Sequence, residues 1–419
     1  WMVRDFIEAD YLLETPGEIE RVAEFMAGEQ SSGTFLAVPG ETPELKARVA
    51  ARVVRIERLD ESDAPALPSR ANSGAGARFR RAHVTLAWPL ATLGPSLPNL
   101  LATVAGNLFE LGPVTGLKLL DIRLPEAFAA AYAGPRFGVE GTRRLAGVRG
   151  RPIIGTIIKP SVGLGPRETA ALVDELCSAG IDFIKDDELQ SDGPACPFDA
   201  RVAAVMQTID RHAQRTGKKT MYAFNLTGDL DQMRRRHDTL LKHGATCMMA
   251  SLNSVGLVGM IELARFGQLP IHAHRNGWGY LSRHPMLGWS YIAWQKIWRL
   301  AGADHMHVNG LGNKFAEEDA SCIASARECL APMFDSKPCA VMPVFSSAQT
   351  ARQAPATYQG LGSADLIVTA GGGIMAHPQG AAAGVAAMQE AWQAAIEGVP
   401  LDDFARNRPN LRQALDMAA

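Results

Sequence analysis

The run 181–188, Ile-Asp-Phe-Ile-Lys-Asp-Asp-Glu, holds the residues with the most evident chemistry. Its apolar first half has the character of a buried parallel strand, but it ends in a lysine and three carboxylates. Because side chains alternate along a strand, Lys185 and Asp187 share one face and Asp186 takes the other. Such charges in an apolar setting must pair or bind an ion, and the oxygen ligands of Asp187 and Glu188 suit Mg2+ better than zinc or copper. The run predicts either a magnesium site or a buried Lys–Asp ion pair.

The length and composition bound the class of protein. The chain has 419 residues, 47% of them hydrophobic and 21% charged, which predicts two globular domains. A net charge of -2 and a pI near 6.6 give no support to binding of nucleic acid or an anionic membrane. No apolar run is long enough to span a membrane, and the first residues are not signal-like. The six scattered cysteines are expected to be reduced, so we expect a cytoplasmic enzyme.

The periodicity of the chain predicts two domains of different architecture. Residues 1–140 fit a ferredoxin-like α+β domain, with strands over 6–13, 47–58, 80–88 and 117–124 and helices over 17–28 and 97–107. From 141 to 419, short apolar strands alternate with helices. The strands are expected over 152–159, 181–187, 220–226, 247–252, 270–275, 305–308, 340–346 and 366–370. The helices include 167–179, 229–242, 260–266, 289–301, 315–329 and 380–395. Eight such units predict a (β/α)8 TIM barrel.

Polar residues gather at the C-terminal ends of these strands, which is the end where barrels build active sites. They are Lys159, Lys185, Asp187, Glu188, Asn225, His272, His274, Arg275, His305, His307, Ser346 and Gly371 to Gly373. The glycine run follows strand eight and fits the usual phosphate cradle of a barrel, although a plain turn is the alternative. The four histidines beside Arg275 are expected to contact an anionic, hydroxylated substrate, with metal ligation as the alternative.

Two lysines fit proton transfer and loop closure. Lys159 stands in Ile-Ile-Lys-Pro at a strand end, where desolvation would lower its pKa and suit it to proton transfer. Lys314 lies in a loop rich in glycine and asparagine, and it either closes over a substrate or is simply exposed. A divalent ion, a lysine acid/base and a phosphate cradle together predict enolate chemistry on a phosphorylated carbonyl compound.

These motifs resemble the RuBisCO large-chain family, and more closely its form IV, the RuBisCO-like proteins that do not fix CO2. The resemblance covers nearly the whole chain and rests on GTIIKPSVGL at 155–164, DFIKDDE at 182–188 and HAHR at 272–275. It implies that Lys159 transfers protons and that CO2 carbamylates Lys185. The lysine carbamate would then bind Mg2+ together with Asp187 and Glu188.

The resemblance also implies roles for other residues of the site. His274 and Lys314 would join the two barrel lysines in catalysis. The phosphorylated substrate would be bound by Arg275, His307, Ser346, Gly371 and Gly372. In the small domain, three residues match positions that complete the site of a neighbouring subunit, which implies a homodimer with shared active sites and leaves higher oligomers open. These residues are Glu29, Thr34 and Asn107.

Departures from the family pattern point away from carboxylation. Ser161 stands where carboxylating members have a second lysine, and Ser347-Ala348 replaces a glycine pair. Retention of Lys159 and Lys314 suits a phosphorylated β-keto sugar acid. One non-carboxylating branch of the family serves apiose breakdown and acts on 3-oxo-isoapionate 4-phosphate, either by carboxyl transfer and hydrolysis or by decarboxylation. The transcarboxylase/hydrolase is the favoured expectation.

Three other functions stay open at this point. One is a methionine-salvage enzyme, either the 2,3-diketo-5-methylthiopentyl-1-phosphate enolase or the methylthioribulose-1-phosphate isomerase. Another is a non-catalytic barrel with a structural or regulatory role, which predicts an eroded metal or phosphate site. The last is an aldolase with a lysine Schiff base, which borohydride would trap at Lys159 or Lys185.

Overall fold

Residues 6–33, 38–70 and 76–417 are described by the computed structural model of the protein, and the chain falls into two units. The N-terminal unit comprises Trp1–Ala133, Gly277–Leu300 and Met333–Pro338. The barrel unit comprises Gly134–Asn276, Ala301–Pro332 and Cys339–Ala419. The expected class of each part, a small α+β domain and a TIM barrel, is confirmed. The expected domain boundary after residue 140 stays a prediction.

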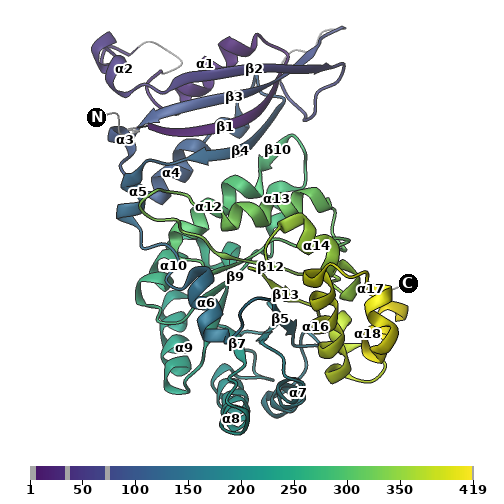
Figure 1. Cartoon of the computed structure of the whole chain (residues 1–419). Helices are drawn as coiled ribbons and strands as arrows, with labels where there is room; N and C mark the ends of the chain where they lie inside the picture. The colour runs from purple at the N-terminus through teal and green to yellow at the C-terminus, as the bar shows by residue number, and fades with distance from the viewer. Residues whose placement is uncertain (1–5, 34–37, 71–75, 418–419) are drawn as a thin grey trace. The chain divides into compact units, whose positions relative to one another are not determined.

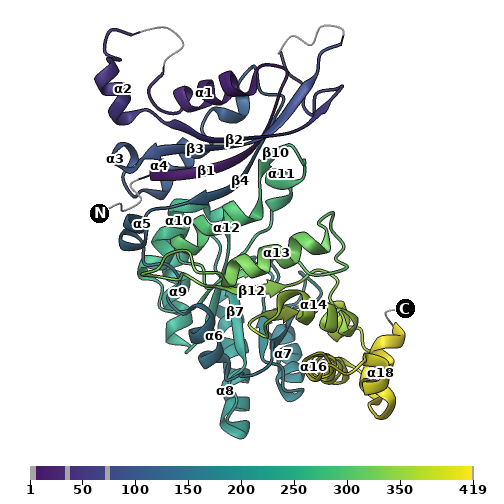
Figure 2. The same ribbon diagram turned by 45° about the horizontal axis from the view of Figure 1, so that its top comes forward.

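The N-terminal unit is built on one mixed sheet. Strand β1 (Phe6–Thr15) pairs antiparallel with β3 (Phe79–Pro89) and β4 (Gly116–Arg123), as Figure 2 shows. Strand β2 (Arg52–Ser62) continues the sheet beside β3, and β10 (Leu287–Trp289) lies parallel to β4. Helix α1 (Ile19–Glu29) packs against β2 and β3. The order β4-β1-β3-β2 is the one that a ferredoxin-like βαββαβ unit requires.

The remaining elements of this unit are short, apart from its last helix. They are α2 (Pro43–Val49), α3 (Leu90–Leu93), α4 (Leu97–Val104), the 3-10 helix η1 (Leu108–Glu110), α5 (Glu126–Ala131), α11 (Trp278–Ser282) and α12 (Tyr291–Ala301). The strand expected from residue 47 begins only at Arg52, because residues 47–49 end helix α2. The Thr42 hydroxyl caps this helix by accepting from Leu45 N, and Pro43 supplies its first turn.

Eight parallel strands close the barrel, in the order β5-β6-β7-β8-β9-β11-β12-β13 and back to β5 (Figure 1). The strands are β5 (Ile153–Ile157), β6 (Phe183–Lys185), β7 (Met221–Asn225), β8 (Cys247–Ser251), β9 (Ile271–His274), β11 (His305–His307), β12 (Met342–Phe345) and β13 (Ile367–Thr369). Each lies within a segment expected to be a strand. The parallel sheet is recognisable from sequence because its strands are short apolar runs.

Helices of the barrel unit alternate with its strands. They are α6 (Gly138–Ala146), α7 (Pro166–Ser178), α8 (Phe198–Thr216), α9 (Leu230–Lys242), α10 (Leu252–Phe266), α13 (Asp319–Leu330), α14 (Ala354–Leu361), α15 (Gly372–Met375), α16 (Ala381–Glu397), α17 (Leu401–Phe404) and α18 (Pro409–Met417). Two 3-10 helices, η2 (Ala351–Gln353) and η3 (Ala405–Asn407), complete the set. Helix α8 fills the expected strand–helix unit between 181–187 and 220–226, for which sequence analysis assigns no helix bounds.

The lower interior of the barrel is filled by alternate residues of the strands. Phe183, Met221, Cys247 and Val344 belong to this core and are fully buried. Space is tight enough that a Cβ added to Gly155 would come within 2.9 Å of the Phe183 ring, so only glycine fits there. The barrel interior below the C-terminal ends of the strands is therefore filled by packed side chains.

The six cysteines are buried and unpaired with one another. Among the described residues, no helix combines the length and the apolar character that crossing a membrane would take.

The buried carboxylate of Asp182 ties the start of β6 to its surroundings. Its oxygens contact Arg151 at 2.6 Å and Lys218 at 2.6 Å, and they accept from Ile154 N of β5 at 2.9 Å. Asp182→Ala should lower the free energy of unfolding by about 3 kcal/mol, because it strands two cations and a buried N–H. Asp199→Ala, which removes an exposed partner of Arg235, should cost less than about 1 kcal/mol. Urea unfolding measures both, and equal losses would contradict a special role for Asp182.

Candidate active site at the barrel rim

Strand β6 places a lysine inside the barrel and two carboxylates above it. The Lys185 side chain is only 1% exposed, and its Nζ lies 3.3 Å from Glu188 Oε2. Asp187 is also buried. Burial lowers the pKa of Lys185 below the ordinary value, and the attraction of Glu188 and Asp187 only partly offsets this effect. The amine therefore loses its proton more readily than that of a free lysine.

Lys159 reaches one of these carboxylates, that of Asp187, from the loop after β5. Its Nζ lies 2.7 Å from Asp187 Oδ2 and donates to Ser161 Oγ at 2.8 Å. The side chain is 42% exposed, so the burial expected for Lys159 is not observed. The reason is that β5 ends at Ile157, two residues before the lysine. The buried lysine of the pair is Lys185.

His274 stands on the other side of Glu188. Its Nε2 lies 3.4 Å from Glu188 Oε2, and Asn276 N donates to its Nδ1 at 3.2 Å. The same Nδ1 lies 3.1 Å from the side-chain Oδ1 of Asn276. Burial, helped by the charge of Lys185, lowers the pKa of His274 to about 4. The imidazole is thus neutral near pH 7.

The histidines of β9 and β11 divide between the rim and the barrel interior. His307 contacts Ser346, with Nδ1 and Oγ 3.0 Å apart. His272 and His305 lie one strand repeat deeper and are fully buried, with the His272 ring 5.1 Å from the Phe183 ring. The expectation that all four histidines contact the substrate is therefore corrected. Side-chain parity alone did not reveal the depth of each residue.

Arg275 is engaged by a carboxylate of the loop after β11. Its guanidinium Nη2 lies 2.5 Å from Glu317 Oε2, and Asn309 Nδ2 donates to the same oxygen at 2.7 Å. An anion that binds Arg275 must share it with Glu317. Lys314 belongs to the same loop, is exposed, and has its Nζ 5.4 Å from the Phe315 ring centre.

The glycine run lies beside Lys159. A Cβ added to Gly371 would be 3.8 Å from Lys159 Cε, and Gly372 faces open space. Gly373 is packed so closely that an added Cβ would meet Gln349 O at 2.3 Å. Gly371 precedes the short helix α15. The placement agrees with the expected rim position, whereas the binding of phosphate there stays a prediction.

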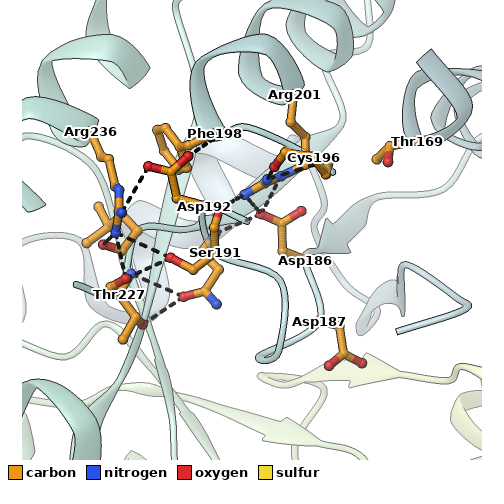
Figure 3. Close-up of polar contacts among 12 residues, drawn as sticks. Thr169, Asp186, Asp187, Ser191, Asp192, Cys196, Phe198, Arg201, Thr227 and Arg236 are labelled. Carbon is orange, nitrogen blue, oxygen red and sulfur yellow. Dashed lines mark hydrogen bonds and ion pairs between the residues drawn. The ribbon is translucent and has the colours of Figure 1, made fainter. Parts of the chain in front are cut away.

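Asp186, on the outer face of β6, holds a buried network that sequence analysis missed (Figure 3). Its carboxylate pairs with Arg201 of α8 at 3.1 Å and accepts from the Tyr222 hydroxyl at 2.6 Å and from Asn225 N at 2.9 Å. In Figure 3, Asp187 points away from this cluster. The alternation expected for Lys185, Asp186 and Asp187 is thereby observed, and α8 supplies the countercharge for Asp186.

The same network secures the loop that follows the carboxylates. Arg201 Nη2 donates to Ser191 O at 2.7 Å, and the Ser191 hydroxyl donates to Thr227 O at 2.7 Å. Arg236 of α9 pairs with Asp192 at 3.0 Å and donates to Thr227 O at 2.6 Å. The backbone on which Asp187 and Glu188 sit is therefore held from behind by two buried arginines.

The residues expected to complete a neighbouring site lie in the N-terminal unit. Asn107 Nδ2 donates to Glu29 Oε1 at 3.3 Å, so these two residues, 78 positions apart, are brought together. Gln30 donates to Ala102 O and Thr103 O, which holds the end of α1 beside α4. Thr34 lies outside the described residues.

Comparison with protein families matches both parts of the chain. Residues 138–417 match the catalytic domain of the ribulose bisphosphate carboxylase large chain, and residues 11–128 match its N-terminal domain. The 3-oxo-isoapionate-4-phosphate transcarboxylase/hydrolase of Xanthobacter autotrophicus is 58% identical over 409 residues, which cover 98% of each chain. The 3-oxo-isoapionate-4-phosphate decarboxylase of Rhizobium rhizogenes is 46% identical over 98% of this chain and 97% of its own.

A solved structure agrees with the fold. The crystal structure of a rubisco-like protein from Burkholderia fungorum has a TM-score of 0.93 and 49% sequence identity. The match covers 99% of this chain and 100% of that chain.

The buried Asp186–Arg201 pair should be needed to position the carboxylates. Arg201→Met should lower the free energy of unfolding by about 3 kcal/mol, because it leaves Asp186 buried without a countercharge. It should also weaken Mn2+ binding by about tenfold, as measured by electron paramagnetic resonance in the presence of bicarbonate. The matched control is Arg211→Met on the exposed side of α8, which should change neither quantity appreciably. An unchanged Mn2+ affinity in a folded Arg201→Met protein would contradict the positioning role.

Proposed function

Because the chain belongs to the RuBisCO large-chain family, we propose that it is a Mg2+-dependent RuBisCO-like enzyme that cleaves a carbon–carbon bond of 3-oxo-isoapionate 4-phosphate. The observation that carries the proposal is the convergence of Lys159, buried Lys185, Asp187 and Glu188 at the rim of the barrel. The Xanthobacter relative supports carboxyl transfer followed by hydrolysis as the reaction. The Rhizobium relative makes decarboxylation the second candidate.

The residues at the rim fit a magnesium site only if Lys185 is modified. Within the described part of the chain, no group of three or more His, Cys, Asp and Glu side chains is placed to hold a metal. Asp186 is committed to Arg201, which leaves Asp187 and Glu188 as two carboxylate ligands. A carbamate formed from CO2 and Lys185 would add a third oxygen ligand. The lowered pKa of Lys185 favours this reaction, because only a neutral amine attacks CO2.

The chemistry that Mg2+ supplies when bound is Lewis-acid stabilisation of an enediolate. The rest of the work falls to side chains of the chain itself. Lys159 Nζ, held between Asp187 and Ser161, is placed to transfer a proton at the reacting carbon. His274 presents the Nε2 of a neutral imidazole to the same side of the site. Lys314, on the loop after β11, would close over the substrate carboxylate.

The anionic ends of the substrate have matching partners at the rim. Arg275 and the backbone N–H groups of Gly371 and Gly372 would bind the phosphate, and Ser346 would bind a nearby oxygen of the substrate. His307 contributes through its contact with Ser346. Ser161, which replaces a lysine of the carboxylating members, accepts a hydrogen bond from Lys159 and removes one positive charge from the rim. This change supports a reaction other than carboxylation.

We further propose a homodimer with shared active sites. The paired Glu29 and Asn107, together with Thr34, would complete the barrel site of a second copy of the chain. A cytoplasmic location is the matching expectation, because six buried, unpaired cysteines suit a reducing compartment.

Turnover should be visible by 31P and 13C NMR with 3-oxo-isoapionate 4-phosphate, Mg2+ and bicarbonate, and EDTA should abolish it. Phosphoglycerate and glycolate as products identify carboxyl transfer and hydrolysis, because water then splits the five-carbon acid into three and two carbons. A tetrulose phosphate and CO2 identify decarboxylation. If no metal-dependent change occurs, the apiose reaction is wrong, and proton exchange of methylthio-pentulose phosphates in D2O tests the methionine-salvage alternative.

Lys185→Ala should lower turnover by at least about 100-fold, because it removes the third oxygen ligand and with it the charge stabilisation. Lys185→Arg keeps the charge but forms no carbamate, and it should be equally inactive. With 13CO2 and Mg2+, a carbamate signal is expected in the wild-type NMR spectrum and not in that of Lys185→Arg. The exposed Lys242→Ala serves as the control and should keep full activity. Full Mg2+-dependent turnover by Lys185→Ala would disprove the shared metal mechanism.

A further inference from the structure

A continuous chain of hydrogen-bonding groups runs through the interior of the barrel unit. It begins at Ser346 on the rim and ends at Thr142 in helix α6, and three histidines connect the two. Successive contacts are His307 Nδ1 to Ser346 Oγ at 3.0 Å, His272 Nε2 to His307 Nε2 at 2.7 Å, His272 Nδ1 to His305 Nδ1 at 3.3 Å, and His305 Nε2 to Thr142 Oγ1 at 2.9 Å. Both ring nitrogens of each histidine therefore contact another member of this hydrogen-bonded row.

The three rings lie in surroundings that keep them neutral. His272 and His305 are fully buried and His307 is 4% exposed. Within this row of hydrogen bonds their partners are hydroxyls and other imidazoles. No carboxylate in the row balances a positively charged ring. Burial lowers the pKa of all three, and the nearby Lys185 acts in the same direction on His272 and His307. A neutral imidazole has one N–H and one bare nitrogen.

The contacts of Thr142 determine which atom donates in each hydrogen bond of this row. The Thr142 hydroxyl donates to Gly138 O within α6, and a carbonyl oxygen can only accept. Thr142 Oγ1 must therefore accept from His305, which places the proton of His305 on Nε2. His305 Nδ1 is then bare and must accept from His272 Nδ1–H.

The same rule assigns the donors and acceptors from His272 to Ser346 at the rim. With its proton on Nδ1, His272 has a bare Nε2 that accepts from His307 Nε2–H. His307 Nδ1 is then bare and accepts the hydroxyl proton of Ser346. The Ser346 oxygen consequently turns its lone pairs, rather than its proton, to the rim.

We propose that this polarised chain makes Ser346 an acceptor for a substrate hydroxyl and that Thr142, at the far end, is a positioning residue for the active site. Ser346 then favours a hydroxyl over a phosphate oxygen, which has no proton to donate at that point. Phosphate is left to Arg275 and the glycine run. This inference relies on the proposed function only in assuming that the substrate contacts Ser346, since the direction of the chain exists without substrate.

Neutron diffraction from crystals exchanged into D2O reads the direction of the chain without any activity. The expected result is deuterium on His305 Nε2, His272 Nδ1 and His307 Nε2, with the Ser346 deuteron facing His307. Deuterium on His307 Nδ1, or on both nitrogens of His272, would overturn the proposal. The measurement decides the proposal even if the enzyme does not act on 3-oxo-isoapionate 4-phosphate.

Thr142→Val tests the link from the buried end to the rim. Valine offers no acceptor to His305, so the chain should reverse, with His307 protonated on Nδ1 and the Ser346 hydroxyl released to the site. Thr142→Ser keeps the hydroxyl and should keep the wild-type protonation pattern, which separates the effect from simple loss of packing. If the active enzyme is in hand, Thr142→Val should raise KM by about three- to tenfold, the value of one hydrogen bond, while Thr142→Ser stays near wild type. An unreversed chain in a folded Thr142→Val protein would disprove the positioning role.

Discussion

The site depends on a lysine buried inside a barrel strand. Lys185 takes an inward position of β6, next to the apolar core of the barrel. It is tolerated there because Glu188 and Asp187 attract its amine and because burial lowers its pKa. A charged amine in that position is costly, whereas a neutral amine or an anionic carbamate bound to a cation is not. The same burial that destabilises the ammonium form favours the neutral amine. The rim residues are arranged around this one condition.

Strand alternation separates the chemistry from its support. Lys185 and Asp187 face the site, while Asp186 between them turns outward to Arg201 and Tyr222. Arg201 also holds Ser191 O, and Arg236 holds the loop through Asp192 and Thr227. The carboxylates thus stand on a backbone that two buried arginines fix from behind. Inside the barrel, the histidine hydrogen bonds link Thr142 of α6 to Ser346 and orient its hydroxyl. Residues of the rim are therefore positioned both from outside the barrel and from its interior.

The residues proposed to bind phosphate and those proposed to bind Mg2+ differ in the contacts that they make within the chain. Arg275 is paired with Glu317, which also receives Asn309, so a phosphate must compete for the guanidinium. Lys314 and Glu317 occupy the same loop, and any exchange of Glu317 for phosphate at Arg275 therefore acts on the segment that carries Lys314. Lys159 contacts Asp187 and Lys185 contacts Glu188 within the barrel unit. Glu29 and Asn107 belong to the N-terminal unit.

The sequence by itself determined the fold class, the eight barrel strands, the outward turn of Asp186 and the family, because strand alternation, apolar runs and short motifs are local properties of the chain. It did not determine how deep each residue lies. Lys159 was expected to be buried and is 42% exposed, and His272 and His305 were expected at the rim and are interior. Nor did it reveal Arg201, Glu317 or Thr142, since each meets its partner only when α8, the loop after β11 or α6 packs against the barrel. Depth and countercharge are decided by tertiary packing because they depend on neighbours that are distant in sequence.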